Sequence, residues 1–582
     1  MPLKNNRVSF FDGIFLSFFT ILITFHPYFL YGEIKFDELG LYLPAIDAVL
    51  HGAIPYRDFF YLRGPGEIYV PAFLMSIWGE NITVLSVYFY VGTVLTLLIC
   101  VFIAMQIYRS RLILYIMVPV LIARTFPRVV FTYWGGFRYG LGLMVIWMAI
   151  RFLKKERFLW IWGAGLLSGL CFFTSVEIGV CAITGISIAL LISYLMKIHD
   201  QRLIQKASTI YFLGMLTFSI PYIFYMIETN SLMDYMRSVY VVLTKMQTVM
   251  DIHQVVPMPR NILEALGVML NPAHDNFKHL TPAYFYLMMI VYLIYRVKKR
   301  QFSKDHLSVV CLAGYGVVLY VSAFRNIWAS QFEMALQPEK ILLFWVFEEI
   351  CLWKRPEQVL SLNSLYDAMT VWANSFRQNI KPRAVRIPFG NIFLIVLICS
   401  SLGYAIQRYN KRFFPFQYAC YRLFGKNTGK LIPLSQIKTK QLTLARARGM
   451  TVPLEQAQEV ETITTFIQEH TAPGEKVFMF PELGVYSFMV DRPFVGRFPV
   501  VTLSWFNDDW HQELLRDLIR QRPNYAVLTK NLPENFFSVY FKRPKNKEFY
   551  DAVVDYIQLH YHVKKETKTA RIYQLKRNTD HP

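Results

Sequence analysis

The stretch FDELGLYLPAIDAVLHGAIPYRDFFYLRGPGEIY, residues 36–69, carries many ionisable side chains directly after an apolar run. It opens on two adjacent carboxylates, Asp37 and Glu38, which begin an amphipathic stretch over 37–51. The apolar residues of that stretch recur at helical spacing, at Leu39, Leu43, Ile46 and Leu50. This pattern predicts a helix that lies along a membrane surface. The helix dipole keeps acids at its N-terminus ionised, although the pair can equally be the solvated end of a membrane span.

Three arginines are candidates for binding a phosphate group, because a guanidinium grips phosphate through two parallel hydrogen bonds. Arg57 and Arg63 lie in the stretch above, and Arg138 lies in TYWGGFRYG between two apolar blocks. Each could instead be an anchor that faces lipid headgroups. Asp58 follows Arg57 directly, so it either contributes to a binding site or pairs with that arginine and caps a turn.

Glu177 stands in a hairpin too short to leave the membrane region, where a carboxylate is costly and is a functional candidate by default. It could ligate a metal, orient an acceptor or be a solvated hairpin tip. His274, Asp275 and His279 form the densest histidine cluster, but their spacing fits no recognised ligand pattern. Whether the protein uses a divalent metal ion therefore stays unknown. The cysteines include no CxxC motif, so they do not indicate a thiolate metal site.

The composition indicates a membrane protein. Of 582 residues, 54% are hydrophobic, 16% are aromatic and only 17% are charged, against about 25% charged in average soluble proteins. The apolar residues come in blocks close to the length that crosses a bilayer. Eleven such spans are predicted, at 10–30, 84–108, 112–123, 140–152, 158–173, 177–196, 210–227, 284–295, 306–323, 340–353 and 389–406. The first is expected to be a retained anchor, because its apolar run exceeds a signal-peptide core.

Basic residues are concentrated in alternate loops, on the same side as the N-terminus. Since positively charged loops stay in the cytoplasm, this predicts a cytoplasmic N-terminus. Residues 32–80, 229–280 and those after 407 are then predicted to lie outside the cytoplasm. The net charge of +21 is largely explained by this rule, so nucleic acid is not an expected partner.

The character of the chain changes after residue 407. Residues 408–450 are basic and irregular, which predicts a juxtamembrane stretch against anionic headgroups. From residue 453 helical and strand patterns alternate, which predicts a small α/β domain with a parallel or mixed sheet. LEQAQEVETITTFIQEH, WHQELLRDLIRQRP and EFYDAVVDYIQLHY are predicted helices, whereas KVFMF, NYAVLTK and ARIYQLK are predicted strands. We therefore divide the chain into a membrane domain, 1–407, and an extracytoplasmic α/β domain, 408–582.

The acidic pair, the amphipathic stretch and GAIPYRDFFYLRGPG together resemble the first outer loop of polytopic GT-C glycosyltransferases. The resemblance is to the branch of protein O-mannosyltransferases and lipid A aminoarabinose transferases. FTSVEIGV resembles an acidic turn between mid-chain spans of that family, and residues 447–482 resemble its outer soluble domain. One stretch departs from the family: RNIWASQFE retains Arg325, but has no acid or histidine in step with an Arg-x-Asp-x-x-His pattern.

The resemblance implies a transfer of a hexose- or pentose-type sugar from a polyprenyl-phosphate donor to a lipid, glycan or protein acceptor outside the cytoplasm. Asp37 is then the expected general base, and Glu38 a helper, a metal ligand or a structural acid. The expected substrate-binding residues are Arg57, Asp58, Arg63, Arg138, Glu177 and Arg325.

The expected fold is a mostly α, GT-C-type bundle of about eleven membrane helices with a small C-terminal α/β domain. Membrane lipids are expected partners. Two other functions fit a similar layout: a transporter or flippase, and a ligase or polymerase that uses lipid-linked oligosaccharide. A transporter seldom needs a large outer domain, and the sequence has no inverted repeat of broken helices.

Overall fold

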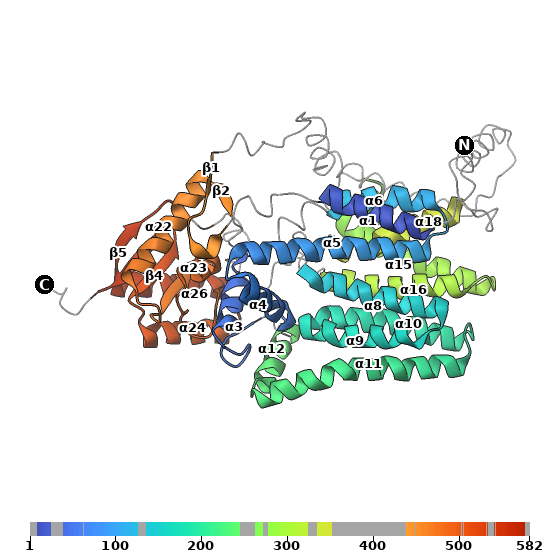
Figure 1. Cartoon of the computed structure of the whole chain (residues 1–582), viewed down its shortest axis with the longest axis horizontal. Coiled ribbons are helices and arrows are strands. Elements are labelled where there is room, and N and C mark those ends of the chain that lie inside the picture. The colour runs from blue at the N-terminus through green and yellow to red at the C-terminus, as the bar shows by residue number, and fades with distance from the viewer. Residues whose placement is uncertain are drawn as a thin grey trace.

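A computed structural model describes residues 8–24, 39–61, 63–125, 136–244, 262–271, 277–323, 334–351, 438–448, 450–501, 503, 506–530, 532, 541 and 543–576. These residues form two parts along the long axis of the molecule, a bundle of helices and a smaller α/β domain (Figure 1). A mostly helical membrane part with a small C-terminal α/β domain is therefore confirmed. The predicted domain boundary at 407–408 lies outside the described residues, as does the predicted span 389–406.

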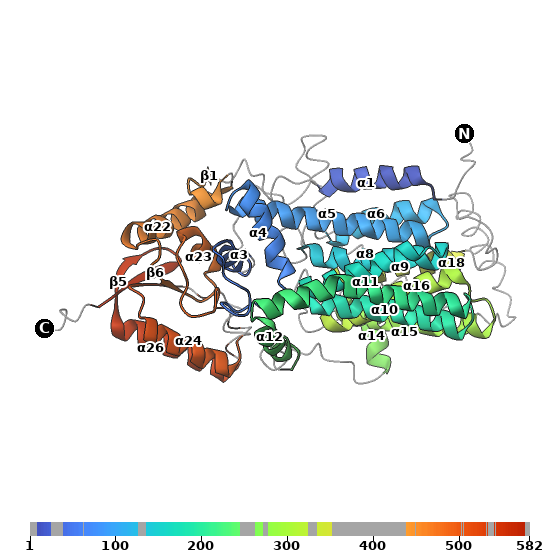
Figure 2. The same cartoon turned by 60° about the horizontal axis from the view of Figure 1, so that its bottom comes forward.

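The helices of the bundle run roughly side by side along the long axis (Figures 1 and 2). They are α1 (Phe10–Thr24), α5 (Ile82–Ile107), α6 (Arg111–Thr125), α8 (Gly136–Lys155), α9 (Phe158–Thr174), α10 (Val176–Leu195), α11 (Gln201–Glu228), α15 (Phe277–Lys298), α16 (Lys304–Ala323) and α18 (Gln337–Cys351). α9 packs closely on α11 and α8, and α10 packs on α16. Their inward side chains form one continuous apolar core.

Four of the described helices, α5, α10, α11 and α16, are long and apolar enough to cross a membrane. α11 shows why the outside of the bundle needs lipid. Its apolar window has a mean hydropathy of 1.7, yet only 17% of it is buried inside the protein. Phe212, Ile220 and Phe224 are among its exposed side chains. A helix that is apolar all round has to be covered on every side, and a bilayer supplies the cover that the protein does not.

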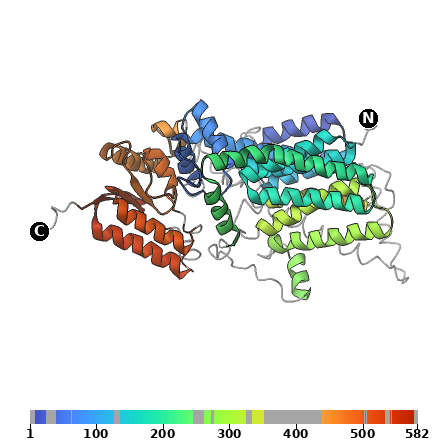
Figure 3. The ribbon, with the colours of Figure 1, turned by 90° about the horizontal axis from the view of Figure 1, so that it is seen from below.

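The junction between the two parts is built from α3 (Leu43–Leu50) and α4 (Gly66–Trp78), which lie at the end of the bundle nearest the α/β domain (Figure 1). α12 (Leu232–Thr244) crosses the same end of the bundle (Figures 1 and 3). α14 (Ile262–Leu270) stands apart from the long helices (Figures 2 and 3).

The α/β domain has a four-stranded mixed sheet with strand order β3-β4-β6-β5, from β3 (Val477–Phe480), β4 (Tyr525–Thr529), β5 (Tyr561–Glu566) and β6 (Ala570–Leu575). β3 and β4 are parallel, whereas β6 is antiparallel to both of its neighbours. α22 (Leu454–His470) and α23 (Gly484–Val490) cover one face, and α24 (Asp508–Gln521) and α26 (Pro544–His560) cover the other (Figures 2 and 3). This double cover explains why β3 is buried along its whole length.

A short hairpin precedes the sheet, formed by β1 (Thr439–Gln441) and β2 (Thr451–Pro453) with the 3-10 helix η4 (Ala445–Ala447) between them. The stretch that was predicted to lie against headgroups extends to residue 450, and its part at 438–448 is folded into this hairpin, while the contact with headgroups stays a prediction. These residues belong to the α/β domain, where Lys440 pairs with Glu461 of α22 at 2.5 Å and Arg446 is buried. The strand β5, which follows α26 without a turn, was not predicted.

The described part of the amphipathic stretch, 39–51, does not turn its apolar face to a membrane surface as predicted. Its described helix, α3, spans only Leu43–Leu50 and packs against α4 on one side and α23 on the other. Leu43 and Ile46 are fully buried there. The apolar face of α3 is thus covered by protein. Residues 39–61 and 63–80, the described part of the predicted first outer loop, share one apolar core with the α/β domain and with the adjoining ends of α5, α11 and α12, whereas the rest of the bundle has a core of its own.

Candidate functional site

The structure places only some of the predicted site residues. Asp37, Glu38 and Arg325 lie outside the described residues, so their roles stay predictions. Arg57, Asp58, Arg63, Arg138 and Glu177 are described, and only two of the three candidate arginines come together.

The loop from α3 to α4 is fixed by two close contacts. Tyr56 adopts a left-handed backbone with φ of 70°, and its hydroxyl donates a hydrogen bond to the carbonyl of Arg63. Gly64 packs against the hairpin between α9 and α10 so tightly that a Cβ atom there would lie 2.2 Å from the carbonyl oxygen of Phe173. No larger residue fits, which explains the glycine in this turn. The turn brings Arg63 to the end of the bundle and starts α4 directly after it.

Arg63 and Arg138 meet at one carboxylate, that of Glu67 in the first turn of α4. Nη1 of Arg63 lies 3.2 Å from Oε2 of Glu67, and Nη1 of Arg138 lies 3.4 Å from Oε1. The side chains of Arg63, Glu67 and Arg138 are 12%, 8% and 3% exposed. Three tyrosines surround these groups, and we call the six residues the arginine cluster: Tyr42, Tyr61, Arg63, Glu67, Arg138 and Tyr139.

The tyrosines supply hydroxyls and ring faces to the charged groups. The hydroxyl of Tyr42 accepts a hydrogen bond from Arg63, and that of Tyr61 donates to Oε2 of Glu67 at 3.4 Å. The guanidinium of Arg138 lies 4.8 Å from the ring centre of Tyr139 and donates to its hydroxyl at 3.4 Å. Burial raises the pKa of Tyr42, while the charge of Arg63 opposes that rise. Tyr42 therefore stays a neutral hydroxyl.

The arginine cluster holds two positive charges and one negative charge in a site that water hardly reaches. Nε of Arg138 is buried and has no hydrogen-bond partner among the described residues. A buried guanidinium nitrogen without a partner is costly, and a further acceptor that hydrogen-bonds to it would remove that cost. Two guanidiniums close to one another are the kind of donors that bind a phosphate oxygen in proteins.

Glu67 was not among the predicted site residues. It stands four positions after Arg63, a spacing that pairs charges on one helical turn, and this signal could have identified it. Tyr42 and Tyr61 gave no such signal, because tyrosines are abundant in this chain.

Arg57 and Asp58 lie apart from the arginine cluster. They pair with each other at 2.7 Å, with side chains 41% and 35% exposed. Asp58 also accepts a hydrogen bond from the N–H of Ile54 at 2.8 Å, and Arg57 reaches the carbonyl of Thr229 at 3.4 Å. The hydrogen bond from Arg57 lowers the pKa of Asp58. The pair thus stabilises a turn, which is the alternative that the sequence left open.

Glu177 lies in the first turn of α10, directly after the hairpin that Gly64 contacts. Its Oε1 accepts a hydrogen bond from the hydroxyl of Ser322 on α16. Its charge also acts on Arg138. Glu177 therefore adds negative charge near the arginine cluster.

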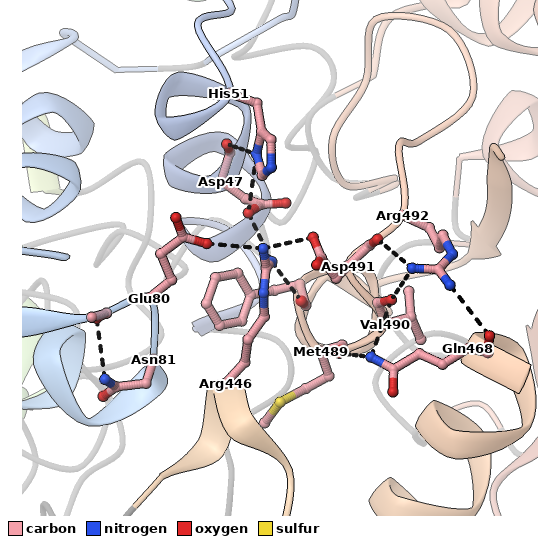
Figure 4. Close-up of polar contacts among 12 residues, drawn as sticks. Asp47, His51, Glu80, Asn81, Arg446, Gln468, Met489, Val490, Asp491 and Arg492 are labelled. Carbon is pink, nitrogen blue, oxygen red and sulfur yellow. Dashed lines mark hydrogen bonds and ion pairs between the residues drawn. The ribbon is translucent and has the colours of Figure 1, made fainter. Parts of the chain in front are cut away.

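One described group has the ligand types for a metal ion, namely Asp47, His51 and Asp491, whose ligand atoms lie within 4.8 Å of one another. Arg446 already pairs with both carboxylates, at 2.7 Å and 2.6 Å (Figure 4). A guanidinium in this place repels a second cation, so the group does not indicate a metal site. The side chains of His274, Asp275 and His279 lie outside the described part of the structure.

Neither a scan of protein-family models nor a search of curated proteins finds a match to the chain. The crystal structure of ArnT from Cupriavidus metallidurans bound to undecaprenyl phosphate is similar with a TM-score of 0.49 at 12% identity, over 98% of this chain and 99% of that one. Its apo state gives 0.47 at 12% identity, over 96% and 97%. The apo oligosaccharyltransferase of Archaeoglobus fulgidus gives 0.46 at 11% identity, over 98% of this chain and 74% of that one.

Proposed function

We propose that the protein is an integral membrane glycosyltransferase of the GT-C type. It transfers a sugar of the hexose or pentose class from a polyprenyl-phosphate-linked donor to a lipid, glycan or protein acceptor outside the cytoplasm. The observation that supports this proposal most is the arginine cluster, in which Arg63 and Arg138 converge on Glu67.

The charge balance of the cluster suits the phosphate of such a donor. Glu67 contacts both guanidiniums through its two carboxylate oxygens, and Nε of Arg138 has no hydrogen-bond partner among the described residues. In a site of low dielectric constant, a guanidinium donor binds a phosphate oxygen more strongly than it would in water. The leaving phosphate of a sugar transfer carries more negative charge than the bound donor does, so a fixed positive charge lowers the barrier as well as binding the donor.

The surroundings of the cluster suit the lipid part of the donor. Glu67 lies on the inner side of α4, whereas Val70, Phe73 and Trp78 on the same helix are exposed and apolar. The outer side of the helix that carries Glu67 can therefore lie against acyl or isoprenoid chains, which is consistent with a donor that is itself a lipid.

The proposed reaction breaks the bond between the sugar carbon and the phosphate oxygen and forms a bond from that carbon to an acceptor oxygen. The acceptor proton passes to a carboxylate, for which Asp37 is the candidate, with Glu38 as its helper. Asp37 stands five positions before Tyr42, whose hydroxyl contacts Arg63. The leaving group, polyprenyl phosphate, stays paired with Arg63 and Arg138 until it is released.

The proposal is tested by measuring the affinity of the purified full-length protein for undecaprenyl phosphate in detergent. Arg63→Gln and Arg138→Gln should each weaken binding by about tenfold or more, because each removes a charged hydrogen-bond donor. Arg57→Gln is the matched control, since Arg57 belongs to an exposed pair. Equal affinities for all four proteins would contradict the proposal.

The acceptor and the sugar are identified by mass spectrometry of envelope lipids and glycans from cells with and without the protein. The proposal expects one defined glycan to lose one sugar. If the glycans stay intact while uptake of a solute is lost, the protein is a transporter instead.

A further inference from the structure

One arginine of the α/β domain reaches into the first outer loop. Nη1 of Arg446 lies 2.7 Å from Oδ1 of Asp47 on α3 and donates to the carbonyl of Phe488 at 2.9 Å (Figure 4). Nη2 lies 2.6 Å from Oδ1 of Asp491 and 3.1 Å from Oε2 of Glu80, just before α5. The guanidinium also stacks on the ring of Phe488, 4.7 Å from its centre. This guanidinium thus joins three separate segments of the chain.

Arg446 supplies the positive charge that offsets the carboxylates gathered at this contact. Three carboxylates surround a single guanidinium, and the Arg446 side chain is only 10% exposed. Asp47 is 15% exposed, and burial raises its pKa while the charge of Arg446 lowers it. Without the arginine, the largely buried carboxylate of Asp47 would face the carboxylates of Glu80 and Asp491. α3 would then move toward solvent, because ionised groups without a partner are costly to bury.

The contact continues from α3 to the arginine cluster. Asp47 lies on a helix of only eight residues, and Tyr42 is the N-cap of that helix. The hydroxyl of Tyr42 accepts the hydrogen bond from Arg63, and Arg63 pairs with Glu67. A short helix moves as one body, so a shift at Asp47 is passed to Tyr42.

The chain before α3 is held by the same domain. A Cβ atom on Gly484 of α23 would lie 2.2 Å from the carbonyl oxygen of Gly40, so the two backbones touch. Gly40 stands three positions after Asp37 in the sequence. The α/β domain therefore contacts the first outer loop on both sides of Tyr42.

We propose that Arg446 is a positioning residue, which holds α3 so that Tyr42 sets the guanidinium of Arg63 for the donor phosphate. This inference rests on the proposed function, because it needs the arginine cluster to bind that phosphate. It gives the α/β domain a part in donor binding.

The experiment compares Arg446→Met with Arg492→Met in the full-length protein. Arg492 is the matched control, because it lies next to Asp491 but, among the described residues, bonds only to groups of its own domain, such as the hydroxyl of Thr471 at 2.9 Å (Figure 4). Two quantities are measured: the dissociation constant for undecaprenyl phosphate, and hydrogen–deuterium exchange of residues 39–50. Arg446→Met should weaken binding about 3- to 30-fold and speed exchange in 39–50. Arg492→Met should do neither.

Two further variants keep the test decisive if Arg446→Met folds poorly. Asp47→Asn removes one charge of the contact without changing its shape and should give the same two effects in smaller measure. Tyr42→Phe removes the hydroxyl that contacts Arg63. If both residues act through the same contact, the double variant Arg446→Met with Tyr42→Phe should bind undecaprenyl phosphate no more weakly than the weaker-binding single variant.

The inference is overturned if Arg446→Met binds undecaprenyl phosphate as the unchanged protein does, or if Arg492→Met loses affinity equally. Additive effects of Arg446→Met and Tyr42→Phe also overturn it. If the unchanged protein does not bind undecaprenyl phosphate, the proposed function itself fails. The exchange data then still show whether Arg446 holds α3.

Discussion

The candidate arginines of this protein differ in burial and in the partners of their charges. Arg57 and Arg63 stand in the same loop, yet one is in an exposed pair and the other shares a buried carboxylate with Arg138. An exposed ion pair is worth little, because water screens it and both side chains lose freedom. A buried guanidinium nitrogen with no hydrogen-bond partner among the described residues, such as Nε of Arg138, is costly unless a further acceptor is bound. Burial therefore separates the turn residue from the binding candidate.

The proposed base gives a prediction at the same scale. Asp37→Asn should lower the rate of sugar transfer about 10²- to 10⁴-fold, because an amide cannot accept the acceptor proton. Its affinity for undecaprenyl phosphate should change little, since Arg63 and Arg138 stay in place. Single-turnover transfer and equilibrium binding measure the two effects, with Asp234→Asn in α12 as the control acid. An unchanged transfer rate would remove Asp37 from the mechanism.

At the scale of elements, α24 shows how burial makes a helix sensitive to pH. His511 on α24 stacks on Phe549 of α26, with ring centres 4.3 Å apart and an angle of 16°. Burial, and after it the charge of Arg543, lower the pKa of His511 to about 4. Its Nε2 has no hydrogen-bond partner in the described part of the chain. The packing of α24 on α26 thus requires a neutral ring.

The sign of the pH dependence follows from this lowered pKa. Below the ordinary value of 6.5, the unfolded chain takes up a proton that the folded domain refuses until about pH 4. Folding stability should therefore be complete above pH 6.5 and fall between pH 6.5 and 4, by on the order of 3 kcal/mol from this group.

The contribution of this histidine is isolated by substitution. His511→Phe keeps the stacked ring and should reduce the acid sensitivity of the melting temperature measured by scanning fluorimetry. His470→Phe is the control, because His470 also stacks on a phenylalanine but is exposed. Equal acid sensitivity in His511→Phe and the unchanged protein would refute the assignment.

At the scale of the whole molecule, the α/β domain and the first outer loop form one packing unit. They share a single apolar core, in which Phe60 of the loop packs on Trp510 and Phe498 at ring-centre distances of 4.4 Å and 5.9 Å. The backbone N–H of Phe60 also donates to the carbonyl of Arg497 at 2.7 Å. The domain is therefore seated on the loop through its own core.

The packing of Phe60 against the α/β domain predicts the effect of removing its ring. Phe60→Ala should destabilise the docked domain by about 3 kcal/mol, as expected for a buried phenylalanine. Limited proteolysis of the full-length protein should then cleave the α/β domain faster. Ile519→Ala on the exposed side of α24 should change little. If Phe60→Ala resists protease as well as the control variant does, the shared core does not hold the domain in place.

The helical membrane part, a parallel or mixed sheet in the α/β domain and several individual elements were predictable from the residues alone. α22 has the predicted bounds, and β3, β4 and β6 lie within the predicted strands. The sequence also predicted that arginines of the first loop and of TYWGGFRYG could bind phosphate. These features follow from periodicity and residue type, which are properties of neighbours along the chain.

Which candidate site residues lie together, and what covers each apolar face, could be seen only in the folded protein. Periodicity shows that one face of α3 is apolar, but a lipid tail and a protein core are equally apolar, so the pattern could not tell a membrane-surface helix from a buried one. The pairing of Arg446 with Asp47 joins residues 399 positions apart, and nothing in local sequence reports such a contact. Arg63 and Arg138 likewise meet only because Gly64 allows the first loop to pack against the hairpin between α9 and α10.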